Sequence, residues 1–237
     1  MTYEELIDLL ISRNALIVHC SRPGKGDEGP NSRLFPDDLR DAIAVCESGA
    51  GDLSCSLVWP GHSKTFGSVG IMLKPRSIAS ISSAHPTDAG TSPDANGRRT
   101  GFGGRFSREA VMDTFANLTD YNEWTMTDAD TIGLFVNLQE SPLEVAKVVD
   151  LTQLPDYNAA MPPLAVLPQP ITLDEVRAAF PDLPIRISGN GDHRDRRRHE
   201  EALSLTRTST ASTTHPQPAL DAEASISNFN LRNLLGV

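Results

Sequence analysis

Two short polar segments beside predicted strands carry side chains suited to binding a ligand. In the first, an apolar run ends in His19, Ser21 and Arg22, which can bind a nucleotide or a carboxamide. In the second, Ser54 and Ser56 alternate with apolar residues, so both hydroxyls point to one face of a strand and can reach one ligand. The plainer alternatives are a core histidine bonded to the backbone and hydroxyls at a strand edge.

A third segment supplies a carboxylate. Tyr121 and Asn122 precede Glu123, and an apolar strand is predicted to follow. A carboxylate in a binding site can stabilise positive charge that develops during a reaction, whereas a solvated strand end is the plainer alternative. Because the three segments occur together in one chain, we interpret them as one candidate site.

Several common catalytic motifs do not occur in the sequence. It contains no G-x-S-x-G, no G-x-x-x-x-G-K-[ST], no H-E-x-x-H and no G-x-G-x-x-G after a strand. These absences argue against the usual hydrolase, P-loop, zinc-protease and dinucleotide-fold classes. The glycines at 101–104 follow a loop rather than a strand, which favours a flexible lid or linker over a phosphate cradle.

Taken in order, the three segments resemble the mono-ADP-ribosyltransferase family. That family has an Arg or His on a first strand, a Ser-x-Ser or aromatic segment on a second, and a Glu on a later strand. Here the matching positions are His19 or Arg22, then Ser54-Cys55-Ser56, then Glu123, within residues 14–138. The resemblance implies an ADP-ribosyltransferase-like fold and a reaction that uses NAD.

The sequence departs from the family pattern two positions before the glutamate. Tyr121 stands where members that modify arginine have Glu or Gln, which disfavours an arginine acceptor. Asn122 before Glu123 is similar to toxin-like members, some of which modify nucleic acid. We therefore expect a macromolecular acceptor, protein or nucleic acid, and a role as a toxin or defence factor.

The resemblance also implies roles for individual residues. Glu123 would stabilise the oxocarbenium-like transition state formed when the nicotinamide–ribose bond breaks. His19 would orient the nicotinamide end or a ribose hydroxyl, and Arg22 would bind the pyrophosphate. No metal is required. The residues expected to bind NAD are Ser21, Ser54, Ser56, Tyr121 and Asn122.

Helical periodicity and capping patterns predict the elements that hold these residues. Helices are predicted over 3–13, from Pro36, from Ser107 to Leu118, and after the Ser-x-x-Glu or Thr-x-x-Glu capping boxes at Ser141 and Thr172. Strands are predicted over 15–20, 53–59, 68–74, 77–83, 123–126 and 132–138, with a long loop over 85–106 and Pro-rich coil over 155–170. The irregular order predicts an α+β fold with a mixed or mostly antiparallel sheet and flanking helices.

Charge divides the chain into two parts. Its 31 acidic and 21 basic side chains among 237 residues give a formal charge of -10. Residues 188–237 hold six acidic and six basic side chains, so the whole negative charge lies in residues 1–187. We interpret 1–187 as one domain and 188–237 as a flexible, largely disordered tail. The end of the tail, 226–235, is more apolar and is suited to docking on the domain or on a partner. The acidic balance argues against a protein that coats nucleic acid through phosphate contacts.

The remaining sequence features concern compartment and alternative functions. Apolar runs are shorter than the ~20 residues that a bilayer requires, and no signal peptide is apparent, so we expect a cytoplasmic protein without membrane contact. A metal site formed by His19, Cys20, Cys46, Cys55 and His62, or a cysteine nucleophile, is a weaker alternative. The main alternative is a non-enzymatic acidic interaction protein, such as a phage-encoded or accessory factor, with the tail as a tether. Oligomeric state is not indicated.

Overall fold

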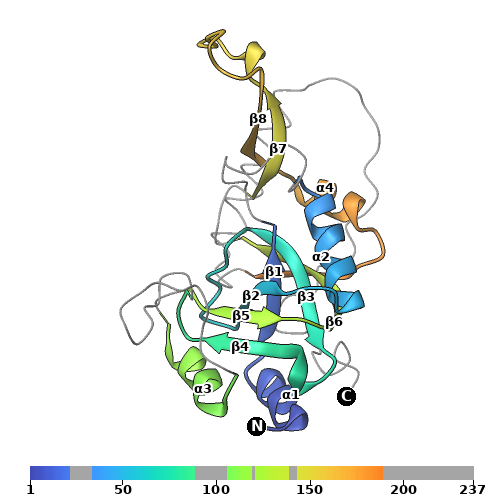
Figure 1. The fold of residues 1–237 in the computed structure, drawn as a ribbon, viewed down its shortest axis with the longest axis vertical. Helices are drawn as coiled ribbons and strands as arrows, with labels where there is room; N and C mark the ends of the chain where they lie inside the picture. The colour runs from blue at the N-terminus through green and yellow to red at the C-terminus, as the bar shows by residue number, and fades with distance from the viewer. Residues whose placement is uncertain (22–33, 89–105, 119–120, 139–142, 189–237) are drawn as a thin grey trace, which may run out of the picture.

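The computed structural model describes residues 1–21, 34–88, 106–118, 121–138 and 143–188 (Figure 1). The described helices are α1 (Tyr3–Ser12), α2 (Asp37–Ser48), α3 (Arg108–Ala116) and α4 (Leu173–Ala179), with short 3-10 turns η1 (Ile78–Ser80) and η2 (Leu151–Gln153). The described strands are β1 (Leu16–Cys20), β2 (Leu53–Val58), β3 (Val69–Pro75), β4 (Ile81–His85), β5 (Glu123–Met126), β6 (Ala129–Asn137), β7 (Glu144–Asp150), β8 (Leu164–Pro170) and β9 (Ile185–Ser188).

Seven of these strands form one sheet in the order β4-β5-β2-β1-β3-β6-β9. Every neighbouring pair is antiparallel except β6 and β9, which are parallel. The predicted α+β class with a mostly antiparallel sheet is therefore confirmed. Figure 1 shows β4 and β5 running across the direction of β1 and β3, so the sheet changes direction between β5 and β1.

Local sequence signals explain where the helices begin. Thr2 caps α1, its side chain accepting from the Glu5 backbone while the Glu5 carboxylate accepts from the Thr2 backbone. Thr172 and Glu175 repeat this capping box at α4, and Ser107 caps α3. Each cap satisfies backbone N–H groups that the first turn of a helix leaves without partners.

The sheet buries Trp124 completely, and this side chain defines the two faces of β5. Its indole Nε1 donates to Thr114 Oγ1 of α3 over 3.3 Å, so α3 covers the Trp124 face. Because strand side chains alternate, Glu123 and Thr125 lie on the opposite face. The register with β4 places His85 opposite Glu123, and therefore on the same face.

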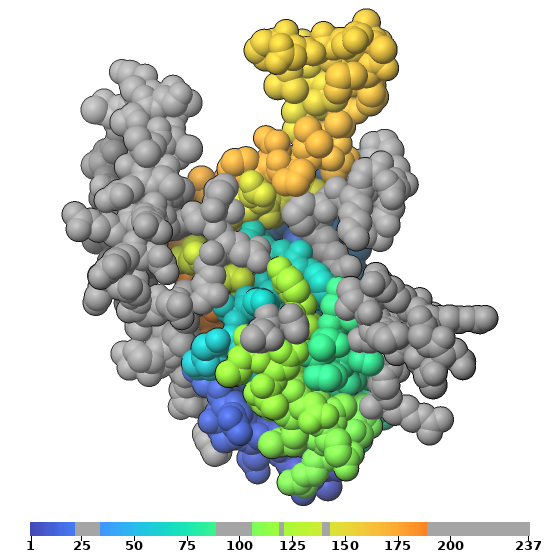
Figure 2. All heavy atoms as spheres, turned by 90° about the vertical axis from the view of Figure 1, so that its left-hand side faces the viewer, coloured from blue at the N-terminus to red at the C-terminus, as the bar shows by residue number. Residues whose placement is uncertain are grey.

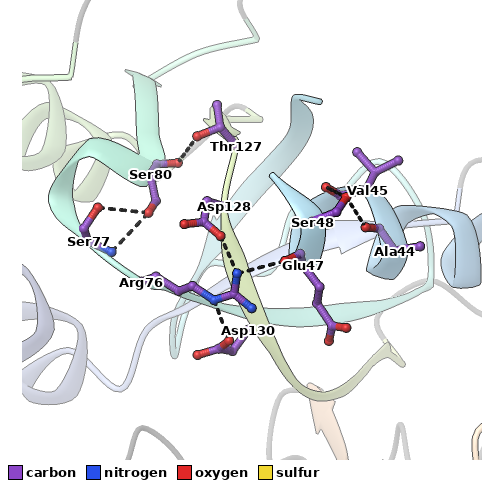
Figure 3. Close-up of polar contacts among 10 residues, drawn as sticks. All are labelled: Ala44, Val45, Glu47, Ser48, Arg76, Ser77, Ser80, Thr127, Asp128 and Asp130. Carbon is purple, nitrogen blue, oxygen red and sulfur yellow. Dashed lines mark hydrogen bonds and ion pairs between the residues drawn. The ribbon is translucent and has the colours of Figure 1, made fainter. Parts of the chain in front are cut away.

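The Arg76 side chain links α2 to the turn between β5 and β6 and to the start of β6 (Figure 3). Arg76 donates to the Asp128 carboxylate over 2.6 Å, to the Asp130 carboxylate over 2.8 Å and to the Glu47 carbonyl over 2.9 Å. All three side chains are exposed, so water and salt screen the two ion pairs and each contributes little to stability. Their combined effect is to hold the far end of the sheet, away from His19 and Glu123.

Gly70 of β3 allows β1 to approach closely at the end of β1 that carries His19. A Cβ at this position would overlap the carbonyl oxygen of His19 and lie 3.0 Å from Cys20 Cα. We expect Gly70→Ala to lower the free energy of unfolding by about 2 kcal/mol, measured by urea denaturation, because backbone atoms must move. Gly51→Ala is the control, since its Cβ would meet only a Val45 methyl, at 3.1 Å. An equal effect of both changes would contradict this explanation.

Three predictions of local structure are wrong. The helix expected after Ser141 is strand β7 from Glu144 onward, and the coil expected over 155–170 contains its partner β8. Val145, Val148 and Val149 are β-branched, so pairing with β8 prevails over a local capping pattern.

The strand expected over 77–83 is η1 followed by β4, and β9 extends the sheet to Ser188, the first residue of the predicted tail. Residues 89–105 and 189–237 lie outside the described residues.

Candidate functional site

Strand β2 is the point at which the sheet divides. Its second half, from Ser56 to Val58, pairs with β1. Its first half, from Leu53 to Cys55, pairs with β5 on the other side. Each half of β2 therefore pairs with a strand on one side only. On the other side, backbone groups of β2 at Ser54 and Leu57 contact side chains instead of a second strand.

Asn122 continues the ladder on the β5 side. Its Oδ1 accepts from the Leu57 N–H over 2.7 Å, and its Nδ2 donates to the Leu57 carbonyl over 2.8 Å. A side-chain amide thus reproduces both hydrogen bonds that a next strand residue would make. Asn122 is buried, and both polar atoms are engaged in this contact. In this structure it positions the start of β5 beside β2, although the sequence predicted a cofactor-binding role for it.

On the β1 side of β2, the His19 side chain likewise contacts a backbone group of β2. The β1–β2 register ends at Val18 opposite Ser56, and beyond it the His19 ring nitrogen Nδ1 lies 2.8 Å from the Ser54 carbonyl oxygen. Because a carbonyl only accepts, Nδ1 carries the proton in this hydrogen bond. The contact fixes the orientation of the ring where β1 and β2 separate.

Ser54 joins His19 to the predicted catalytic glutamate. Its hydroxyl Oγ donates to Glu123 Oε1 over 2.6 Å, while its carbonyl contacts His19. All three residues are partly buried. The structure therefore brings together one residue from each of the three predicted segments, on the adjacent strands β1, β2 and β5.

Two other predicted residues, Ser21 and Ser56, make contacts outside this contact chain. Ser21 is buried and donates its hydroxyl to Asp38 of α2, and Ser56 is buried within the sheet. Burial raises the pKa of Asp38, and the Ser21 hydrogen bond opposes that shift. These positions favour structural roles for both serines. Arg22 lies outside the described residues.

Tyr121 stands at the edge of the site, beside two residues that the sequence did not single out. Its ring stacks on Phe66, with centroids 5.0 Å apart, and Lys64 Nζ lies 5.8 Å from the ring centre. Tyr121 remains 38% exposed, so part of its ring is available for a ligand. Lys64 thus places a cation beside the Tyr121 ring, in a domain whose net charge is negative.

Two further histidines lie beside β5, and the sequence considered them only in the weaker metal-site and cysteine-nucleophile alternatives. His85 is brought opposite Glu123 only by the β4–β5 register, for which the sequence holds no signal. His62 is buried and stacks on Trp59, with ring centroids 4.2 Å apart. Its Nε2 lies 3.2 Å from Asn122 Nδ2. An amide nitrogen only donates, so Nε2 accepts and His62 is neutral.

The neutral state of His62 makes stability depend on pH. Burial lowers the pKa of His62 below its ordinary value. Below about pH 6.5 the unfolded chain protonates this histidine while the folded chain keeps it neutral. The stabilising contribution is therefore present above about pH 6.5 and is lost as the pH falls through it.

We expect His62→Gln to reduce this loss of stability in acid. A glutamine oxygen can accept the Asn122 hydrogen bond but does not titrate. The measurement is the drop in melting temperature between pH 7.5 and pH 5.5, which should be smaller for His62→Gln than for the wild type. Exposed Asp and Glu side chains are common to both proteins and cancel in the comparison. An identical drop would show that another group controls the acid response.

The cysteines do not gather at this site. All three are buried thiols outside disulfides, and burial raises the pKa of the Cys46 thiol to about 11. A high pKa disfavours the reactive thiolate. Among the residues that the structure describes, no three His, Cys, Asp or Glu side chains lie close enough to hold a metal ion.

Comparisons with protein-family models, with curated proteins and with solved structures find no match to this chain. None of the helices in the described ranges has the length and apolar composition needed to span a bilayer. A function is therefore inferred from the side chains of this protein alone.

Proposed function

We propose that this protein is an NAD-dependent mono-ADP-ribosyltransferase acting on a macromolecular acceptor, protein or nucleic acid. The observation that carries the proposal is the contact chain from His19 through Ser54 to Glu123, across three adjacent strands. The sequence resemblance requires a histidine or arginine, a serine segment and a glutamate on three strands. Their proximity supports that resemblance, because the three residues are far apart in sequence.

The transfer step gives Glu123 its role. The bond between the nicotinamide nitrogen and the ribose carbon breaks, and nicotinamide leaves as a neutral molecule with the bonding electron pair. A nucleophilic atom of the acceptor then forms a new bond to that carbon and releases its proton. Positive charge develops on the ribose between these events, and the Glu123 carboxylate stabilises it. The same group is suited to accepting the proton.

Ser54 and His19 hold this carboxylate and the substrate in place. The Ser54 hydroxyl restrains one Glu123 oxygen, which limits the orientations that the carboxylate can adopt. The His19 ring is oriented by its Nδ1 contact with the Ser54 carbonyl, and His19 would orient the nicotinamide end or a ribose hydroxyl. Tyr121 would contact the nicotinamide ring, and Lys64 would offset the negative charge of the substrate.

The test is direct binding and turnover of NAD by the full chain. Calorimetric titration should detect NAD binding, and incubation with NAD labelled on the adenylate should release nicotinamide and label protein, RNA or DNA offered as acceptor. Release without labelling would identify NAD hydrolysis, which needs the same carboxylate. No binding at millimolar NAD by a chain with an intact thermal transition would overturn the proposal and favour a non-enzymatic interaction protein.

A further inference from the structure

The hairpin formed by β7 and β8 stands away from the rest of the described structure, at the top of Figure 1 and again in Figure 2. Its register runs from Glu144 opposite Pro170 to Asp150 opposite Leu164, and no third strand joins it in the described part of the chain. A two-stranded sheet alone in water is marginally stable. A segment that packs on this hairpin would therefore stabilise it.

The outer half of the hairpin exposes a concentration of apolar side chains. Val145 and Ala146, near the body, are buried. Among the described residues, eight large apolar side chains are exposed, and five of them lie on this hairpin and its end loop: Val148 (45%), Leu154 (49%), Met161 (47%), Leu164 (56%) and Leu167 (37%). In the β7–β8 register Val148 and Leu164 share one face of the hairpin, whereas Leu167 lies on the other. Scattered exposed apolar residues need no explanation, but several on one projecting element indicate a binding surface.

The backbone of β7 offers hydrogen bonds at the same place. The Ala146 carbonyl accepts from the Phe35 N–H, on the side of β7 away from β8. Because backbone groups alternate along a strand, those of Val148 and Asp150 point to that same outer side. An extended peptide can pair with this edge, where its side chains would lie beside Val148.

Charge distinguishes the candidate occupants. Residues 143–170 contain the acids Glu144, Asp150 and Asp156 but a single cation, Lys147, whose ammonium lies 3.2 Å from Glu175. A second copy of the hairpin would bring the same acids against these. Residues 226–235 carry five large apolar side chains, Arg232 and no acid. Their composition complements the hairpin in both apolar character and charge.

The tether between the two regions favours docking within one chain. Residues 189–225, the 37 residues between the last described residue, Ser188, and residue 226, can extend up to about 120 Å. A polar connection of this length keeps its end at an effective concentration in the millimolar range. Separate copies in a micromolar solution are about a thousandfold more dilute than this. The chain's own segment therefore competes favourably with a second copy.

We propose that residues 226–235 dock on the outer half of the β7–β8 hairpin of the same chain, pairing with the outer edge of β7 and covering the face that carries Val148 and Leu164. This docking involves none of the residues of the NAD site. It would give the apolar end of the sequence a place on the domain.

The test is hydrogen exchange of the hairpin in the full chain. We expect amides within 145–167 to exchange about tenfold faster in the triple variant Leu231→Ser, Leu234→Ser, Leu235→Ser than in the wild type. The matched control replaces the three other leucines of the tail, Leu203, Leu205 and Leu220, by serine and should leave exchange unchanged. Both variants leave the described domain intact, so folding of the domain is not at risk.

The reciprocal experiment uses the exposed hairpin side chain Leu164, where Leu164→Asp should increase exchange within 226–235. Equal hairpin exchange in the wild type and both triple variants would overturn the proposal. Protection that increases with protein concentration, together with a dimeric mass in light scattering, would overturn it in favour of a second copy. Neither readout depends on NAD, so this result is independent of the proposed activity.

Discussion

Glu123→Gln is expected to reduce nicotinamide release from NAD by about 10²–10³-fold, because an amide cannot stabilise the positive charge that develops on the ribose. The glutamine oxygen can still accept the hydrogen bond that Ser54 donates to Glu123 over 2.6 Å. The melting temperature should therefore stay close to that of the wild type. Rates are measured at saturating NAD, with thermal unfolding recorded on the same samples.

Glu109→Gln on α3 is the matched control for this prediction. Glu109 is exposed in the first turn of α3. Its replacement by glutamine removes the same negative charge at a helix away from the contact chain. It should retain wild-type turnover. If Glu123→Gln were as active as Glu109→Gln, Glu123 would have no catalytic role, even if NAD binding were intact.

Asn122→Ala is expected to lower the free energy of unfolding by about 3–5 kcal/mol. The change leaves the Leu57 N–H, the Leu57 carbonyl and His62 Nε2 without the partner that each has now. A buried polar group that loses its partner destabilises the fold by about 1–3 kcal/mol, partly offset by the loss of a buried amide. Urea unfolding monitored by tryptophan fluorescence measures the effect, since Trp124 is two residues away.

Two comparison variants separate burial from the loss of an asparagine. Asn158→Ala removes an exposed side chain that accepts from the Ala160 N–H over 2.9 Å, and water can replace that bond, so its effect should be below about 1 kcal/mol. Asn122→Asp keeps the acceptor for the Leu57 N–H and, at low pH where the carboxyl is protonated, has one O–H donor for the two acceptors that the Asn122 amide nitrogen serves, so its effect there should be intermediate. Similar effects of Asn122→Ala and Asn158→Ala would contradict the proposed ladder function.

Elements with a strong local pattern were predictable from sequence. The apolar spacing and acids of α1, the Thr172 capping box of α4 and the boundaries of β5 all agree with the structure. The capping box at Ser141 failed because a cap pattern describes only one turn. Strand β7 is decided by pairing with β8, about 20 residues later, and by burial of Val145 and Ala146.

The candidate site also contains residues that the sequence could predict and residues that it could not. The sequence identified His19, Ser54 and Glu123 as polar residues beside strands, because each breaks an apolar run. It held no signal for His85, which reaches Glu123 only through the β4–β5 register. It also assigned Asn122 to a ligand, whereas the structure engages both of its polar atoms with Leu57.

The sequence by itself determined the residue types, the main helices and strands, the acidic balance of residues 1–187 and the apolar end of the chain. These depend on composition and on contacts between near neighbours. Only the tertiary structure decided that β2 divides between β1 and β5, and that Ser54 therefore contacts both His19 and Glu123. Strand order arises from hydrogen bonds and packing between distant segments, which no local pattern specifies.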